Sequence, residues 1–179
     1  MIDSPAFRLF AMRGLFVAIC LVIVFLRMLP LNTLPPLWTG PDLLLVLTIA
    51  WAQRRPEYVP AVLIAAVMLF ADFLLQRPPG LLALLTVLAC EQLRTGSAGL
   101  RDASFAGEWI AAGSAIIGVT LIGRAILTVL MVEQAPLGLT LIQMVLTILA
   151  YPLVVLASHV FFGIRRPSPG SDDLVGGRP

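Results

Sequence analysis

The chain has 179 residues, of which 59% are hydrophobic and 12% are charged, and its formal net charge is +2 at pH 7. About a quarter of the residues of a soluble globular domain are charged, so this composition excludes that class and predicts an integral membrane protein. All twelve basic residues are arginine. The small net charge gives no indication of binding to nucleic acid, and no nucleic-acid partner is expected.

Six apolar segments lie between charged or proline-rich stretches, at residues 14–29, 42–52, 58–75, 80–93, 109–131 and 139–163. Apolar runs of this kind cross a hydrocarbon core of about 30 Å as helices, so we expect an all-α fold with six transmembrane helices. The second segment spans only about 16 Å at a rise of 1.5 Å per residue. It is therefore predicted to be a short helix shielded by its neighbours. Pro41 suits its first helical position, and Asp42 places a negative charge at the positive end of its dipole.

Arginine in the connecting loops predicts the orientation, because arginine collects on the cytoplasmic side of short loops. Alternate loops contain the pairs Arg8 and Arg13, Arg54 and Arg55, Arg94 and Arg101, and Arg165 and Arg166, whereas the opposite loops hold only Arg77 and Glu133 as charges. Both termini are therefore expected in the cytoplasm. Residues 1–166 are predicted to form one transmembrane domain, and residues 167–179, rich in Pro, Gly, Ser and Asp, a disordered cytoplasmic tail.

Four charged residues are predicted at similar depth near the outer face: Arg27, Asp42, Asp72 and Arg124. A charge in the hydrocarbon layer costs roughly 2.5–3.5 kcal/mol on insertion scales, so each needs a partner or a function. The spacing predicts one charge-balanced cluster, with Asp72 and Arg124 as its principal pair. Two interpretations stay open: a site that binds a ligand or transmits a conformational state, or an internal ion pair that fixes helix register.

Small residues recur along the fifth segment, at Gly107, Ala111, Ser114, Gly118 and Ala125. Such a stripe lets another helix approach closely. It is predicted either to bind a partner chain or to pack within the chain's own bundle.

The sequence contains no catalytic pattern. It has no paired acid with a histidine, no nucleophile beside a base and no glycine-rich phosphate loop. Cys20 and Cys90 lack the spacing of zinc ligands and fall within apolar runs, where a free cysteine acts as a small hydrophobe. We therefore expect a protein that is not an enzyme and has no cofactor, no metal and no disulfide.

One motif has a family resemblance. Asp72 is followed by Pro78 at +6 and Gly80 at +8, which resembles the signature of the MreD family, the rod-shape-determining inner-membrane proteins of bacteria. The similarity extends to Pro41-Asp42 and to the loop 54–58, and it covers residues 40–94.

The resemblance implies a non-enzymatic scaffold of the bacterial cell-wall elongation complex, multi-pass in the inner membrane and controlling cell shape. Its partners would be MreC and, through MreC, the glycosyltransferase RodA and its transpeptidase partner, within the lipid bilayer. The MreD family is also similar to the six-helix substrate-binding subunits of energy-coupling-factor vitamin transporters. That similarity gives an alternative function, a membrane-embedded small-molecule or lipid-binding subunit.

The alternative predicts an outer-facing pocket beneath the loop 30–41, lined by aromatic and polar side chains beside Asp42 and Asp72. Whether the protein is a monomer or a homodimer stays open.

Overall fold

The computed structural model describes residues 5–29, 39–96 and 105–162. Within these ranges the chain forms six α-helices and no strands, which confirms the all-α class. The helices are α1 (Pro5–Met28), α2 (Leu43–Arg54), α3 (Ala61–Leu74), α4 (Leu81–Gly96), α5 (Phe105–Val129) and α6 (Leu137–Phe162). The predicted tail 167–179 lies outside the described residues.

Three helices, α1, α5 and α6, are long and apolar enough to cross a membrane by length and composition. All three expose large apolar side chains; Phe25 on α1 is 63% exposed and Leu153 on α6 is 68% exposed. The helices α2 and α3 are apolar but shorter. Apolar surface of this extent marks contact with lipid or with a partner.

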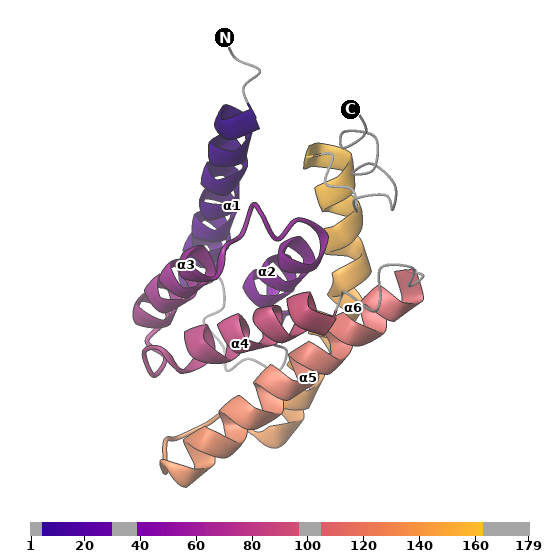
Figure 1. Cartoon of the computed structure of the whole chain (residues 1–179). Helices are drawn as coiled ribbons and strands as arrows, with labels where there is room; N and C mark the ends of the chain where they lie inside the picture. Colours follow the sequence, from indigo (N-terminus) through magenta and orange to yellow (C-terminus); the bar gives the residue numbers. More distant parts are fainter. Residues whose placement is uncertain (1–4, 30–38, 97–104, 163–179) are drawn as a thin grey trace, which may run out of the picture.

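The short helix α2 lies inside the bundle and contacts α1, α4, α5 and α6 (Figure 1). Every residue from Leu44 to Ala52 is buried, which confirms that α2 is shielded by its neighbours. Trp51 is completely buried and donates from Nε1 to Ser158 Oγ on α6 at 3.1 Å. The ring of Phe16 on α1 lies 5.5 Å from that of Trp51. A continuous apolar sequence therefore becomes the centre of the core.

Polar and proline residues set the start of two helices. Asp42 is the N-cap of α2, and its Oδ1 accepts from the N–H of Leu45 at 3.3 Å. Pro41 precedes this cap, so its predicted place at the first helical position is wrong; a cap needs a side-chain acceptor, which Asp42 supplies. Likewise α3 begins at Ala61, after the N-cap Pro60, and not at Tyr58. A proline disfavours the helical conformation of the residue that precedes it.

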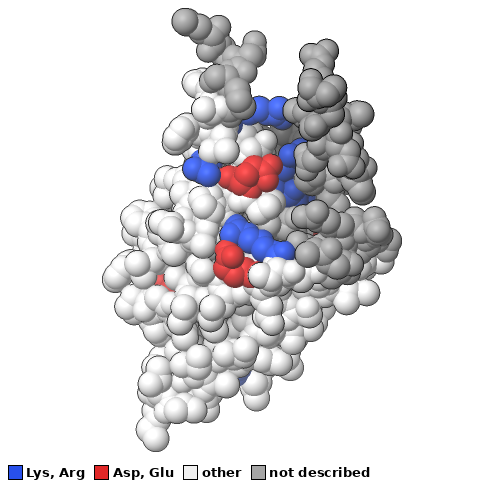
Figure 2. Space-filling view, viewed as in Figure 1, with Lys and Arg blue, Asp and Glu red and all other residues white. Residues whose placement is uncertain are grey.

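On one face of the bundle, charged side chains gather towards one end. The first turn of α1 and the last turn of α6 lie on the same side of the molecule (Figure 1). Figure 2 shows charged side chains gathered towards that side, above a body that is almost uncharged on this face. Arg13 on α1 donates there to the carbonyl of Glu57 at 3.0 Å. The α3–α4 and α5–α6 turns form the opposite end.

Candidate functional site

The motif residues Asp72 and Gly80 build the turn between α3 and α4. The side chain of Asp72 is buried, and its Oδ2 accepts from the N–H of Gly80 at 3.1 Å and of Ala83 at 3.3 Å. The first N–H groups of a helix have no partner within the helix, and a carboxylate satisfies them while it complements the helix dipole. Asp72 on α3 therefore caps α4.

The backbone of the same turn explains why the motif requires particular residues. α3 ends in a Schellman motif: the N–H of Arg77 donates to the carbonyl of Asp72 at 3.0 Å, and the N–H of Gln76 to that of Phe73 at 3.3 Å. Gly80 has φ +87°, where a side chain would be strained. Pro78, with its fixed φ, follows directly after the Schellman turn. The motif residues therefore determine the backbone conformation of the α3–α4 turn.

The predicted ion pair between Asp72 and Arg124 is wrong. Among the described residues Asp72 forms no ion pair, and its Oδ1 has no hydrogen-bond partner. Arg124 instead donates from Nη1 to the carbonyl of Ala135 at 3.0 Å and to Thr140 Oγ1 at 2.6 Å. Residue types alone do not reveal that main-chain N–H groups satisfy Asp72, or that a carbonyl and a hydroxyl satisfy Arg124.

Asp42 is the carboxylate that the arginines surround. Its Oδ1 lies 3.5 Å from Nη2 of Arg27, and its Oδ2 lies 3.6 Å from Nη1 of Arg77. Arg27 also donates to the carbonyl of Pro41 at 2.8 Å. The N–H of Asp42 donates to Thr147 Oγ1 on α6 at 2.9 Å. Of the predicted cluster, the structure pairs Arg27 with Asp42 and adds Arg77, which the prediction lacked.

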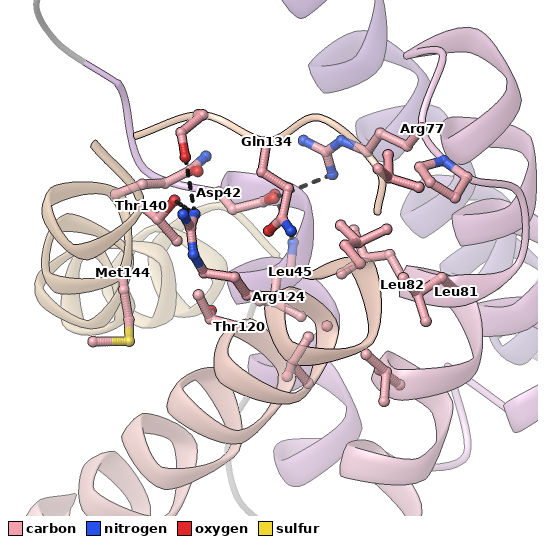
Figure 3. A pocket seen from close by; sticks show the side chains of 18 of the residues that line it. Asp42, Leu45, Arg77, Leu81, Leu82, Thr120, Arg124, Gln134, Thr140 and Met144 are labelled. Carbon is pink, nitrogen blue, oxygen red and sulfur yellow. Dashed lines mark hydrogen bonds and ion pairs between the residues drawn. The ribbon is translucent and has the colours of Figure 1, made fainter. Parts of the chain in front are cut away.

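A pocket of about 420 Å³ opens beside Asp42 (Figure 3). It lies between the start of α2, the α3–α4 turn, α4, α5, the α5–α6 loop and α6. Its polar lining includes Arg77, Arg124, Gln134, Thr140 and Gln143, and leucine is the commonest residue of its apolar lining. No aromatic side chain lines it among the described residues, and residues 30–38 of the loop above the predicted pocket lie outside those residues. Asp72 does not line it either, because its carboxylate faces α4.

The pocket is bounded by a close approach of α4 and α5. A Cβ built on Gly123 would lie 3.3 Å from Cδ1 of Leu85. At the end of α5 a second Schellman motif, with Met131 at φ 54°, turns the chain so that Gln134 reaches back to Thr128 Oγ1 at 3.1 Å. This turn and the bonds of Arg124 hold the loop over the pocket.

The predicted small-residue stripe on α5 is only partly packed. Ser114 and Ala125 are exposed, and Gly107, Ala111 and Gly118 are partly buried. A Cβ at Gly118 would meet nothing within 4 Å. The glycine of α5 that packs against α6 is Gly113, whose Cβ would lie 3.7 Å from Ile148.

A groove of about 520 Å³ runs between α4 and α5 beside this stripe. Ser114 and Gly118 line it from α5, and Leu88, Ala89 and Gln92 line it from α4. The stripe therefore borders open space that its own bundle does not fill.

A buried polar cluster near the other end of the bundle escaped prediction. Arg54 on α2 donates to both carboxylate oxygens of Glu108 on α5, at 2.7 and 3.1 Å. The hydroxyl of Tyr151 on α6 lies 2.8 Å from Glu108 Oε1 and 2.6 Å from Gln53 Oε1. The available signal was an acid in the first turn of a long apolar helix. Its partner, distant in sequence, could not be chosen among the several arginines of the chain.

Comparison with protein-family models, with curated proteins and with solved structures finds no match to this chain. Within the described ranges no group of three or more His, Cys, Asp or Glu side chains is placed to hold a metal ion. Cys20 and Cys90 are both free and buried.

Proposed function

We propose that the chain is a multi-pass scaffold of the bacterial inner membrane, acting in the cell-wall elongation complex by binding MreC and, through it, supporting RodA and its transpeptidase partner. The observation that carries the proposal is the turn from Asp72 to Gly80. The residues that resemble the MreD signature are the ones that cap α4 and close the turn. These residues join α3 to the start of α4 and so fix the shape of the bundle, which a scaffold requires.

The proposal includes six crossings with both termini in the cytoplasm, as in the substrate-binding subunits of energy-coupling-factor transporters. Burial of α2 supports it, because a helix surrounded by protein need not match the thickness of the hydrocarbon core. The arginines near the start of α1, among them Arg13, Arg54 and Arg94, support the orientation. Arg94 bonds to Glu91 and to the carbonyl of Val59, and Arg54 to Glu108. This grouping follows the positive-inside rule.

The groove between α4 and α5 is the face we assign to the single transmembrane helix of MreC. Small residues at Ser114 and Gly118 permit close backbone approach, and association of helices in lipid depends on such packing. A shorter run of exposed small residues lies on α1, at Ala11, Gly14 and Ala18.

Co-purification tests this function. The full-length chain, co-expressed with MreC and extracted in a mild detergent, is expected to retain MreC through affinity capture and gel filtration. Two folded proteins that separate under these conditions would contradict the scaffold.

The pocket beside Asp42 favours a second candidate, a membrane-embedded small-molecule or lipid-binding subunit. A volume of about 420 Å³ lies within the usual range of ligand pockets. Native mass spectrometry of the protein purified from membranes is expected to show a retained non-covalent ligand. A spectrum of bare protein under conditions that preserve membrane-lipid adducts would argue against it.

A further inference from the structure

We propose that the pocket beside Asp42 binds the headgroup of an anionic phospholipid, with the phosphate at Arg124 and the apolar part against the leucine-rich wall. The inference rests on the second function above and names its ligand class.

The first step is the balance of charge in the pocket. Its lining contains two carboxylates, Asp42 and Glu133, and two guanidinium groups, Arg77 and Arg124. Asp42 is compensated by Arg77 and, from outside the pocket, by Arg27. Glu133 is exposed and forms no ion pair with an arginine in the described ranges. The charge of Arg124 is therefore left without a carboxylate partner among the described residues.

The second step is the hydrogen-bonding capacity of Arg124. Only its Nη1 has partners in the described part of the chain, Ala135 O and Thr140 Oγ1. These two bonds fix the guanidinium on the pocket wall and leave Nε and Nη2 available as donors. Arginine in this arrangement suits the bidentate recognition of phosphate. Figure 3 shows Arg124 beside Thr140 at the cavity.

The third step is the uncharged polar lining. Gln143 is partly buried, and its amide has no hydrogen-bond partner in the part of the chain that the structure describes. An amide that both donates and accepts suits the hydroxyl groups of a headgroup such as glycerol. Thr120 adds a hydroxyl at the same cavity. The lining thus offers a cation and neutral hydrogen-bonding groups together.

The fourth step is the apolar wall. Leu81 and Leu82 on α4, Leu45 on α2 and Met144 on α6 line the pocket. A soluble phosphate compound would leave this wall in contact with water, whereas the glycerol backbone and first methylene groups of a lipid would cover it, and burial of that apolar surface favours binding. The ligand class that uses both parts of the lining is an amphiphile.

The test is a lipid titration of the full-length protein in a neutral detergent, followed by native mass spectrometry. Phosphatidylglycerol is expected to bind at least about tenfold more tightly than phosphatidylcholine. Both lipids carry the phosphate, but the choline cation of phosphatidylcholine is repelled by Arg77 and Arg124 and lacks the hydroxyl groups that Gln143 would bond. Arg124→Gln is expected to remove the preference and Arg124→Lys to restore part of it. Arg8→Gln, which removes an exposed arginine of α1 far from the pocket, is the matched control and should keep the preference.

Arg124 also bonds the α5–α6 loop through the carbonyl of Ala135, so its substitution can destabilise the fold. A second variant therefore changes a lining residue whose side chain forms no such bond within the described ranges. Gln143→Ala should leave the melting temperature of the lipid-free protein unchanged and still weaken the binding of phosphatidylglycerol several-fold. Equal binding of the two lipids, an unchanged preference in Arg124→Gln, or an equal rise in melting temperature with inorganic phosphate alone would overturn the proposal. A soluble ligand retained in place of lipid would contradict the lipid assignment and still support a binding function. Bare protein in every spectrum would contradict both proposals.

Discussion

The carboxylate of Asp72 accepts the N–H of Gly80 at 3.1 Å, so that one buried side chain of α3 holds the start of α4. This contact joins the two residues of the motif that lie farthest apart in it. It also gives the motif a physical role. Gly80 adopts φ +87° without strain, and in that conformation its N–H donates to Asp72.

Removal of the Asp72 carboxylate should destabilise the protein. Asp72→Ala leaves the N–H groups of Gly80 and Ala83 without an acceptor, at a cost of about 1–2 kcal/mol by analogy with N-cap substitutions. Thermal unfolding in detergent measures the loss as a lower melting temperature. Glu133→Ala, which removes an exposed carboxylate at the same end, is the control and should leave it unchanged. An equal effect of the two substitutions would contradict the capping role.

Exchange of the charges of Asp72 and Arg124 should bring no recovery. The two residues have separate partners, so Asp72→Arg combined with Arg124→Asp should be at least as destabilised as either single variant. Direct contact would instead appear as a favourable coupling energy in a double-mutant cycle.

Gly80→Ala should destabilise through backbone strain. At φ +87° an L-residue costs about 1–2 kcal/mol. Gly14→Ala is the matched control, because Gly14 lies exposed in the middle of α1 and a Cβ there meets nothing. That substitution should raise stability by about 0.5–1 kcal/mol. Opposite shifts of the two melting temperatures are expected; shifts of the same sign would contradict the account of the turn.

The buried pair Arg54 and Glu108 should show strong coupling. Their side chains are 13% and 3% exposed, and removal of one partner leaves an uncompensated buried charge at a cost of about 3 kcal/mol. Arg54→Met and Glu108→Leu should each lower the melting temperature. The double variant should lose less than the sum of the two single losses. Strict additivity in the cycle would show that the pair is not coupled.

Much of the fold follows from sequence because apolar run length is a property of the chain itself. The six segments, the short second helix and the negative charge of Asp42 at its start were predictable on that basis. The boundaries shifted where local chemistry decided them, as at Pro60, which delays α3.

The partners of the buried charges were not predictable. Depth along a helix placed Asp72 and Arg124 at one level. Asp72 instead accepts from main-chain N–H groups, and Arg124 donates to a main-chain carbonyl and to the hydroxyl of Thr140. No residue type marks such a main-chain group. The pairing of Arg54 with Glu108 depends in turn on how α2 and α5 pack, and the pocket depends on six separate segments.

The measurement that tests the proposed scaffold most directly is the amount of MreC recovered with groove variants of the full-length chain. Gly118→Leu adds a bulky side chain where the structure has open space, so the fold should tolerate it while the groove is blocked. Ala66→Leu makes a comparable change at an exposed position of α3. We expect Gly118→Leu to lose most of the MreC that the unchanged protein retains and Ala66→Leu to retain it. Equal recovery of MreC with both variants would contradict the assignment of the α4–α5 groove, and no recovery with the unchanged protein would contradict the scaffold itself.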